Sequence, residues 1–168
     1  MKIIIGQLIG FVATVLCFLI YQQKDRKRIL FVKLLADLTW MLHYFLLSAY
    51  SGVAICIIST IRAIVFLNPE KKWADKRFWV PLFLLMAGVM GYLTWNGIFS
   101  LFPILASVIS IISFAQNKPK ITRLLAFPVS ASLLTYDFYI HSIPGIVNES
   151  AVIISSFIGL LRYDKKSK

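Results

Sequence analysis

The sequence predicts an all-α membrane protein, in which seven transmembrane helices form two parallel three-helix bundles joined by a linker helix. Three observations lead to this fold class. The 168 residues are 59% hydrophobic and 15% charged, with a mean hydropathy of +0.80, whereas a soluble domain carries about 25% charged residues. The hydrophobic residues form seven runs, and basic and uncharged connections alternate between them. The second half of the chain also repeats a pattern of the first half.

Seven apolar runs predict the helices of a single membrane domain, because about 20 mostly apolar residues cross the hydrocarbon core of a bilayer. The first run is not a cleaved signal peptide, since six more runs follow it. The third and seventh runs are short, and we expect them to extend into their turns or to cross a locally thin region. The runs cover residues 3–21, 29–50, 53–67, 78–95, 98–115, 124–140 and 146–161.

Lys and Arg gather in the first, third and fifth connections and in the tail, and are absent from the other connections. Cytoplasmic loops carry an excess of Lys and Arg. Seven spans with the N-terminus outside and the C-terminus in the cytoplasm satisfy this alternation, and Lys2 alone is left on the outer side. The clusters are Lys24, Arg26, Lys27 and Arg28; Lys71, Lys72, Lys76 and Arg77; Lys118, Lys120 and Arg123; and Lys165, Lys166 and Lys168.

These basic clusters indicate the ionic partners of the chain. A net charge of +11 would suggest nucleic-acid binding in a soluble protein. Here the clusters are short, separate and next to the predicted bilayer surface. We therefore expect anionic lipid headgroups as partners and no nucleic acid. The sequence leaves self-association into a homo-oligomer open.

A shift of 93 residues aligns the two halves of the chain. The match covers two helices and both turns and fades in the third helix, where we expect the register to slip by several residues. The sequence thus predicts repeat 1 over 1–67, a linker helix over 78–95 and repeat 2 over 98–164. With three helices in each repeat, one linker helix makes the repeats parallel, and transporters commonly bind their substrate between such halves. The aligned residues are Ala13-Thr14-Val15 with Ala106-Ser107-Val108, Gln23 with Gln116, Lys27 with Lys120, and Gly52 with Gly145.

Three residues are candidate hinges of such a bundle. Gly10 aligns with Pro103 under the same shift, and Pro128 lies inside the sixth run. Proline removes a backbone donor and can kink a helix, and glycine weakens one. The alternative is that all three are tolerated bends that do not move.

Asp37 and Arg62 are ionisable residues at membrane depth, where a charge is costly and therefore a functional candidate. Asp37 lies roughly 12 Å from the cytoplasmic boundary at the rise of an α-helix, and Arg62 has a similar depth on the next helix. We interpret this pair as an inner gate. A structural ion pair, with Lys33 one turn from Asp37, is the alternative. Glu149 opens the last helix at the outer face and is either an outer gate residue or a carboxylate stabilised by the helix dipole.

Five residues are candidates for solute binding, and they lie deep in the predicted membrane core or past its middle: Trp40, His43, Tyr44, Tyr136 and Asp137. Trp40 and Tyr44 share a helix face with Asp37, and the 93-residue shift places His43 on Tyr136 and Tyr44 on Asp137. An aromatic surface with a few donors and acceptors suits a small polar ligand. Interhelical hydrogen bonding without a ligand explains the same residues. A single His without nearby Cys or His ligands does not predict a metal site.

The same segments resemble a known family. The sequences His43-Tyr44-Phe45-Leu46-Leu47, Tyr50 and Ile61-Arg62, and later Phe138, Ser142-Ile143, Gly145, Glu149 and Arg162, resemble the YgjV-type bacterial inner-membrane proteins. That family is similar to the SWEET and PQ-loop transporters, which share a three-plus-one-plus-three helix plan. The resemblance implies a bacterial inner-membrane location and a solute path between two three-helix bundles. This chain has no Pro-Gln pair in either repeat.

The function predicted from these features is transport of a small polar solute by alternating access between the two repeats. We expect no enzymatic activity and no cofactor, because the chain contains no phosphate-binding loop, zinc motif or nucleophile–base–acid set. The alternative is a non-transporting membrane sensor, receptor or assembly module whose polar groups are sealed in interhelical hydrogen bonds.

Overall fold

The computed structural model describes residues 2–20, 26–66, 68, 71–115 and 119–160, and the regular structure within them is entirely helical. Seven α-helices in these residues confirm the predicted all-α class. Two 3-10 turns, Lys72–Ala74 and Ile98–Ser100, precede the fourth and fifth helices. The helices are α1 Lys2–Ile20, α2 Arg26–Leu46, α3 Tyr50–Phe66, α4 Lys76–Leu93, α5 Leu101–Ala115, α6 Pro119–Tyr139 and α7 Ile143–Gly159.

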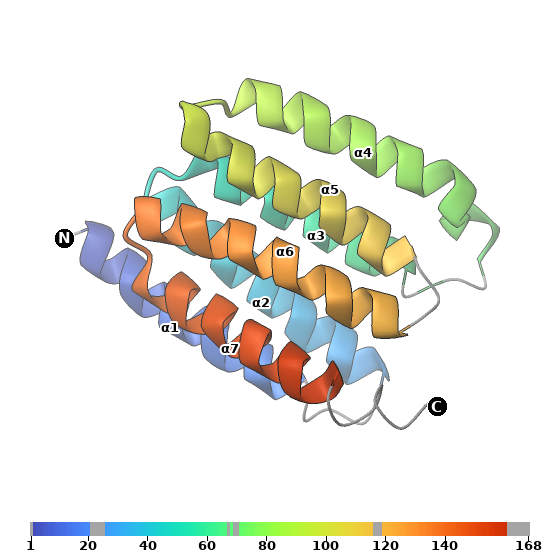
Figure 1. Ribbon diagram of the computed structural model, residues 1–168, viewed down its shortest axis with the longest axis horizontal. Helices are drawn as coiled ribbons and strands as arrows, with labels where there is room; N and C mark the ends of the chain where they lie inside the picture. Colours follow the sequence, from blue (N-terminus) through green and yellow to red (C-terminus); the bar gives the residue numbers. More distant parts are fainter. Residues whose placement is uncertain (1, 21–25, 67, 69–70, 116–118, 161–168) are drawn as a thin grey trace.

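The helices form two facing layers, with α1, α2 and α3 in one and α7, α6 and α5 in the other (Figure 1). Within each layer the central helix, α2 or α6, contacts both of its neighbours. Between the layers α1 packs on α7 and α3 packs on α5, whereas α4 covers the edge formed by α3 and α5. Consecutive helices run in opposite directions, so α2 and α6 run the same way.

Side-chain caps and left-handed residues set several helix ends. The carboxylate of Asp75 accepts a hydrogen bond from the Arg77 N–H at 2.9 Å and caps the start of α4. Ser142 caps α7 in the same way, through the Gly145 N–H. Ser48 and His141 have φ values of 58° and 55° directly after α2 and α6. A left-handed residue there ends a helix and turns the chain.

The 93-residue shift reproduces the bounds of the second and third helices of each predicted repeat, whereas α1 (2–20) would correspond to 95–113 and α5 spans 101–115. Adding 93 to the ends of α2 (26 and 46) gives those of α6 (119 and 139), and adding it to the ends of α3 (50 and 66) gives those of α7 (143 and 159). The two left-handed residues, Ser48 and His141, correspond as well. The predicted slip of register in the third helix is therefore wrong. The Gln23–Gln116 match lies outside the described residues.

Large apolar side chains cover much of the outside of the bundle, while several polar side chains, including His43, Asp137 and Ser130, are buried inside it. This is the distribution expected of a protein surrounded by lipid. By length and hydropathy together, α1 is the described helix that qualifies as a membrane span, over Lys2–Leu19. Shorter apolar helical stretches lie within α3, α4 and α7, and one more covers the 3-10 turn at Ile98 and most of α5.

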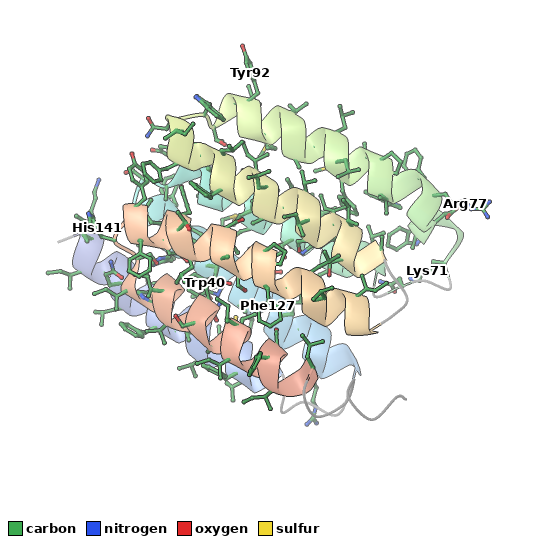
Figure 2. All side chains as sticks on the ribbon, in the orientation of Figure 1. Trp40, Lys71, Arg77, Tyr92, Phe127 and His141 are labelled. Atoms are coloured by element: carbon green, nitrogen blue, oxygen red, sulfur yellow. The ribbon has the colours of Figure 1, made fainter. Side chains whose placement is uncertain are left out.

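The two ends of the bundle differ in charge. Figure 2 shows Lys71 and Arg77 at one end and His141 at the opposite end, with Trp40 near the middle. The end of α1 and the starts of α2 and α6 lie at the end of Lys71 and Arg77, because the helices alternate in direction. We call this the basic end. Of the predicted basic residues, Lys24, Lys118, Lys165, Lys166 and Lys168 lie outside the described residues.

The three predicted hinges occupy different settings. Pro128 lies inside α6, as predicted. Pro103 is the third residue of α5, so it lies in the first turn of that helix, where its missing N–H breaks no hydrogen bond within the helix. Gly10 lies within α1, where a Cβ atom would come 2.3 Å from Pro144 Cγ and 2.6 Å from His43 Nδ1. Its role in the structure is close packing of α1 against α2 and the start of α7.

Candidate functional site

A cavity of about 220 Å³ lies in the middle of the bundle, between the two layers. This volume corresponds to roughly seven water molecules. Six helices contribute to its wall, and α4 is the described helix that does not. The wall combines three ionisable residues, two aromatic rings, two thiols, three hydroxyls and one amide. These are Asp37, Arg62 and Glu149; Trp40 and Tyr44; Cys17 and Cys56; Ser59, Ser107 and Ser110; and Asn148.

The aromatic part of the wall comes from α2. The rings of Trp40 and Tyr44 are stacked, with centroids 5.7 Å apart and an interplanar angle of 27°. Trp40 Nε1 donates a hydrogen bond to Cys17 Sγ at 3.3 Å, which fixes the indole against α1. Both residues were predicted to bind solute, and their position on the cavity agrees with the shared helix face inferred from their spacing.

The basic side of the cavity holds Asp37 and Arg62. Lys33 Nζ contacts the two Asp37 carboxylate oxygens at 2.9 and 3.1 Å, so the ion pair one turn apart along α2 forms. Arg62 Nη1 donates to Ser110 Oγ at 2.9 Å and links α3 to α5. Both predicted inner-gate residues therefore line the same cavity, and each is buried.

Glu149 lies deeper in the bundle than the sequence predicts. The last helix begins at Ile143, not near residue 146, so Glu149 is its seventh residue and lies about 9 Å along the axis. Its predicted place at the outer end of the helix is wrong, and the dipole account fails because that effect is confined to the first turn. Asn148 Nδ2 donates to Glu149 Oε1 at 3.1 Å, and the Ser130 hydroxyl also bonds to this carboxyl group.

His43 is fully buried but does not line the cavity. Its Nδ1 lies 2.8 Å from the Gly6 carbonyl oxygen, and its Nε2 lies 2.8 Å from Ser142 Oγ. A carbonyl can only accept, so Nδ1 carries the proton and donates to Gly6, and the Ser142 hydroxyl can donate to Nε2. The Gly145 N–H in turn donates to Ser142 Oγ at 3.1 Å. His43 thus joins α1, α2 and the start of α7.

Tyr44, Tyr136 and Asp137 form a dense layer between the cavity and the end opposite the basic end. The Tyr44 hydroxyl donates to Asp137 Oδ1 at 3.2 Å, across the two layers. Asp137 Oδ2 is buried and has no hydrogen-bond partner within the described structure. The Tyr136 ring lies 6.4 Å from that of Tyr44, and its hydroxyl bonds to Ser51 and the Gly52 backbone. Tyr136 and Asp137 therefore lie beyond the cavity wall.

Sequence reasoning missed the polar residues that α3, α5 and α7 contribute to the wall. The missed residues are Ser59, Ser107, Ser110 and Asn148. Isolated hydroxyls and amides are common at helix–helix contacts in membrane proteins, so their presence alone carried no signal. The 93-residue shift would have pointed to Ser110 in the first helix of the second repeat, and to Asn148 if its register had been extended through the third helix. It pairs Cys17 with Ser110 and Ile55 with Asn148, and both members of each pair line the cavity.

Two comparisons with known proteins point to the same family. The profile of the Imp-YgjV family, described as bacterial inner membrane protein, matches residues 4–167. The chain is 20% identical over 166 residues to Inner membrane protein YgjV of Escherichia coli (strain K12), and the alignment covers 98% of this chain and 87% of that protein. No solved structure matches. The chain therefore belongs to the Imp-YgjV family of bacterial inner membrane proteins. The predicted resemblance is confirmed, and the more distant similarity to SWEET and PQ-loop transporters stays a prediction.

Proposed function

We propose that this inner membrane protein is a carrier for a small polar solute. In this proposal α1–α3 and α5–α7 are two equivalent halves, α4 links them, and all seven helices span the bilayer. The solute occupies the central cavity, and rocking of the halves opens the cavity to one side of the membrane at a time.

The observation that carries the proposal is the composition of the cavity wall. Residues that correspond under the 93-residue shift line the cavity from both halves, and the paired positions are Cys17 and Ser110, Trp40 and Leu133, Ile55 and Asn148, and Cys56 and Glu149. The cavity therefore lies on the seam between the halves. Transporters built from parallel repeats commonly place the substrate at such a seam.

The charge distribution supports an orientation. Short cytoplasmic loops are enriched in Lys and Arg, so we place the basic end in the cytoplasm, the N-terminus outside and the C-terminus inside. Anionic lipid headgroups would then contact the basic connections. Because both halves of the site belong to one chain, a homo-oligomer is compatible with the carrier but is not needed to complete its cavity.

The two ends of the cavity differ in closure. The layer of Tyr44, Tyr136 and Asp137 lies on the outer side, and all three side chains are at most 6% exposed. On the cytoplasmic side the Lys33 and Asp37 side chains are 28% and 12% exposed. We interpret this conformation as one with the outer gate closed and the cavity directed toward the cytoplasm. This moves the outer gate from Glu149 to the Tyr44–Asp137 contact and leaves Asp37 and Arg62 at the inner side.

A non-transporting module is the second candidate, and the His43 contacts favour it. Both ring nitrogens of His43 are satisfied within the protein, by Gly6 and Ser142, as a purely structural role requires. A module of this kind would keep its cavity closed to both sides of the membrane, whereas a carrier exposes it in turn to each.

The two native cysteines allow a direct test. Cys17 and Cys56 are the two cysteines of the chain, and both line the cavity. A membrane-impermeant maleimide is applied to vesicles of each orientation, with Cys17→Ser and Cys56→Ser to assign the label. We expect labelling from the cytoplasmic face in the resting protein, and labelling from the outer face after Tyr44→Phe weakens the outer layer. If neither thiol reacts from either face while both react after denaturation, the carrier proposal is wrong.

A further inference from the structure

Each proposed half contributes a carboxylate to the cavity, but the two carboxylates differ in their counter-ions. Asp37 has Lys33 one turn away, with Nζ at 2.9 Å. Glu149 is hydrogen-bonded to Asn148 and Ser130, which are neutral. The first half therefore neutralises its acid within the chain, whereas the donors that reach Glu149 from the described residues are neutral.

The repeat shows why the second half lacks a counter-ion. Under the 93-residue shift Lys33 corresponds to Ala126, and Arg62 corresponds to Ser155. The two positions that place basic residues near the cavity in the first half are thus uncharged in the second. Arg62 lines the same cavity but donates to Ser110 on α5. A buried carboxylate without a bonded cation is costly, so an external cation that enters the cavity would stabilise Glu149.

Two aromatic rings in the cavity wall provide a second attractive interaction for a cation. The stacked rings of Trp40 and Tyr44 line the same wall as Glu149. Aromatic rings attract cations through their quadrupole, and tryptophan does so most strongly. The indole N–H is already donated to Cys17, so the remaining interaction that Trp40 can offer a solute comes from its ring.

We infer that the solute carries an ammonium group, which pairs with Glu149 beside the Trp40 ring. The inference rests on the proposed carrier function and specifies the chemical class of its solute. The cavity of about 220 Å³ limits the solute to a small molecule, because it holds only roughly seven waters. Asn148 and Ser130 orient the carboxylate toward that group.

Binding of matched pairs of small molecules to the purified full chain tests this inference. Ethanolamine is compared with ethylene glycol, and 1,4-diaminobutane with 1,4-butanediol, by calorimetry and by the shift in melting temperature. Each pair has the same number of heavy atoms and differs in the ammonium group. We expect at least tenfold tighter binding of each amine than of its diol, since charge-assisted hydrogen bonds are the stronger class. Equal affinities within both pairs, or no binding of any of the four, would overturn the inference.

Two variants assign the effect to Glu149. Glu149→Gln keeps the side-chain shape and removes the charge, and it should lower amine affinity at least tenfold while leaving diol affinity unchanged. Asp75→Asn removes a charge outside the cavity and keeps a residue suited to capping α4, and it should bind amines like the parent chain. If Glu149→Gln does not fold, Trp40→Leu provides the second test and should lower amine affinity at least threefold. Unchanged amine binding in the folded variant refutes the assignment.

The outcome separates this inference from the carrier proposal. Amine binding that depends on Glu149, together with thiols that are closed to both faces, supports a cation-binding module and refutes transport. Thiols that open in turn to both faces, together with no preference for amines, support transport and refute the ammonium assignment.

Discussion

Gly145→Ala is expected to destabilise the protein, whereas the same substitution at Gly88 is expected to stabilise it. A Cβ atom on Gly145 would lie 2.4 Å from Asp137 Cγ and Oδ2. Carbon atoms pack best at about 3.5–4.0 Å, so the Asp137 carboxyl group must move by roughly 1 Å. A Cβ atom on Gly88, inside α4, would have no heavy atom within 4 Å under the same criteria.

The magnitude follows from three contributions. Overpacking of this kind costs about 1–3 kcal/mol. Moving the carboxyl group also weakens the hydrogen bond from Tyr44, at 3.2 Å, which contributes about 1 kcal/mol. Alanine recovers at most about 1 kcal/mol of helix propensity over glycine, and less in the first turn. The net loss for Gly145→Ala is therefore about 1–3 kcal/mol, against a gain of about 0.5–1 kcal/mol for Gly88→Ala.

Unfolding in mild-detergent micelles by titration with SDS, followed by circular dichroism, measures both differences. The mechanism is tested by a double-mutant cycle with Asp137→Ala, which removes the group that the new methyl would meet. We expect the two substitutions to be less than additive by at least about 0.5 kcal/mol. Equal effects of Gly145→Ala and Gly88→Ala, or full additivity in the cycle, would refute the reasoning.

Two further predictions concern the packing network and the topology. His43→Ala should reduce the amount of folded protein in the membrane, because the Ser142 hydroxyl and the Gly6 carbonyl lose their hydrogen bonds to the imidazole, at a cost of about 2–4 kcal/mol, and solute binding per folded molecule should be unchanged. Normal folding with lost binding would instead place His43 in the site. Reporter proteins inserted after Ser51, Gly97 and His141 should all read as outside, and one cytoplasmic result would overturn the orientation.

The number of helices could be predicted from the sequence more accurately than the residues at which they begin and end. Seven apolar runs gave seven helices, but α2 begins at Arg26 and α6 at Pro119, each several residues before its apolar run. Hydropathy marks where a helix enters the lipid, and a polar first turn lies outside that signal. The register of α7 with α3 was missed for a related reason. Helix length and turn geometry are retained there, while Cys56 and Glu149 no longer resemble each other.

The face of a helix predicted which residues line the cavity better than depth in the membrane did. Successive residues of an α-helix are separated by roughly 100°, so Tyr44 lies about 20° from Asp37 around α2, and Trp40 about 60°. Both line the cavity with Asp37. His43 lies roughly 120° from Asp37 and points to α1 and Ser142 instead. Grouping His43 with the cavity residues used its depth along the helix, and depth does not determine direction.

In the proposed arrangement of two halves, the Tyr44–Asp137 contact is one that an assembly of two identical chains could not form. The two residues are 93 positions apart and bonded to each other, so they occupy corresponding positions that meet at the seam. Identical residues there would place two buried carboxyl groups or two phenols against one another, and like charges at contact distance are unfavourable. Each residue also packs against the corresponding glycine, Gly52 or Gly145, so the backbone stays equivalent while one half supplies the donor and the other the acceptor. The same divergence makes the two sides of the cavity different, because the first half contributes Trp40, Tyr44 and Arg62 and the second contributes Asn148 and Glu149. A site with two unlike sides can orient an asymmetric solute.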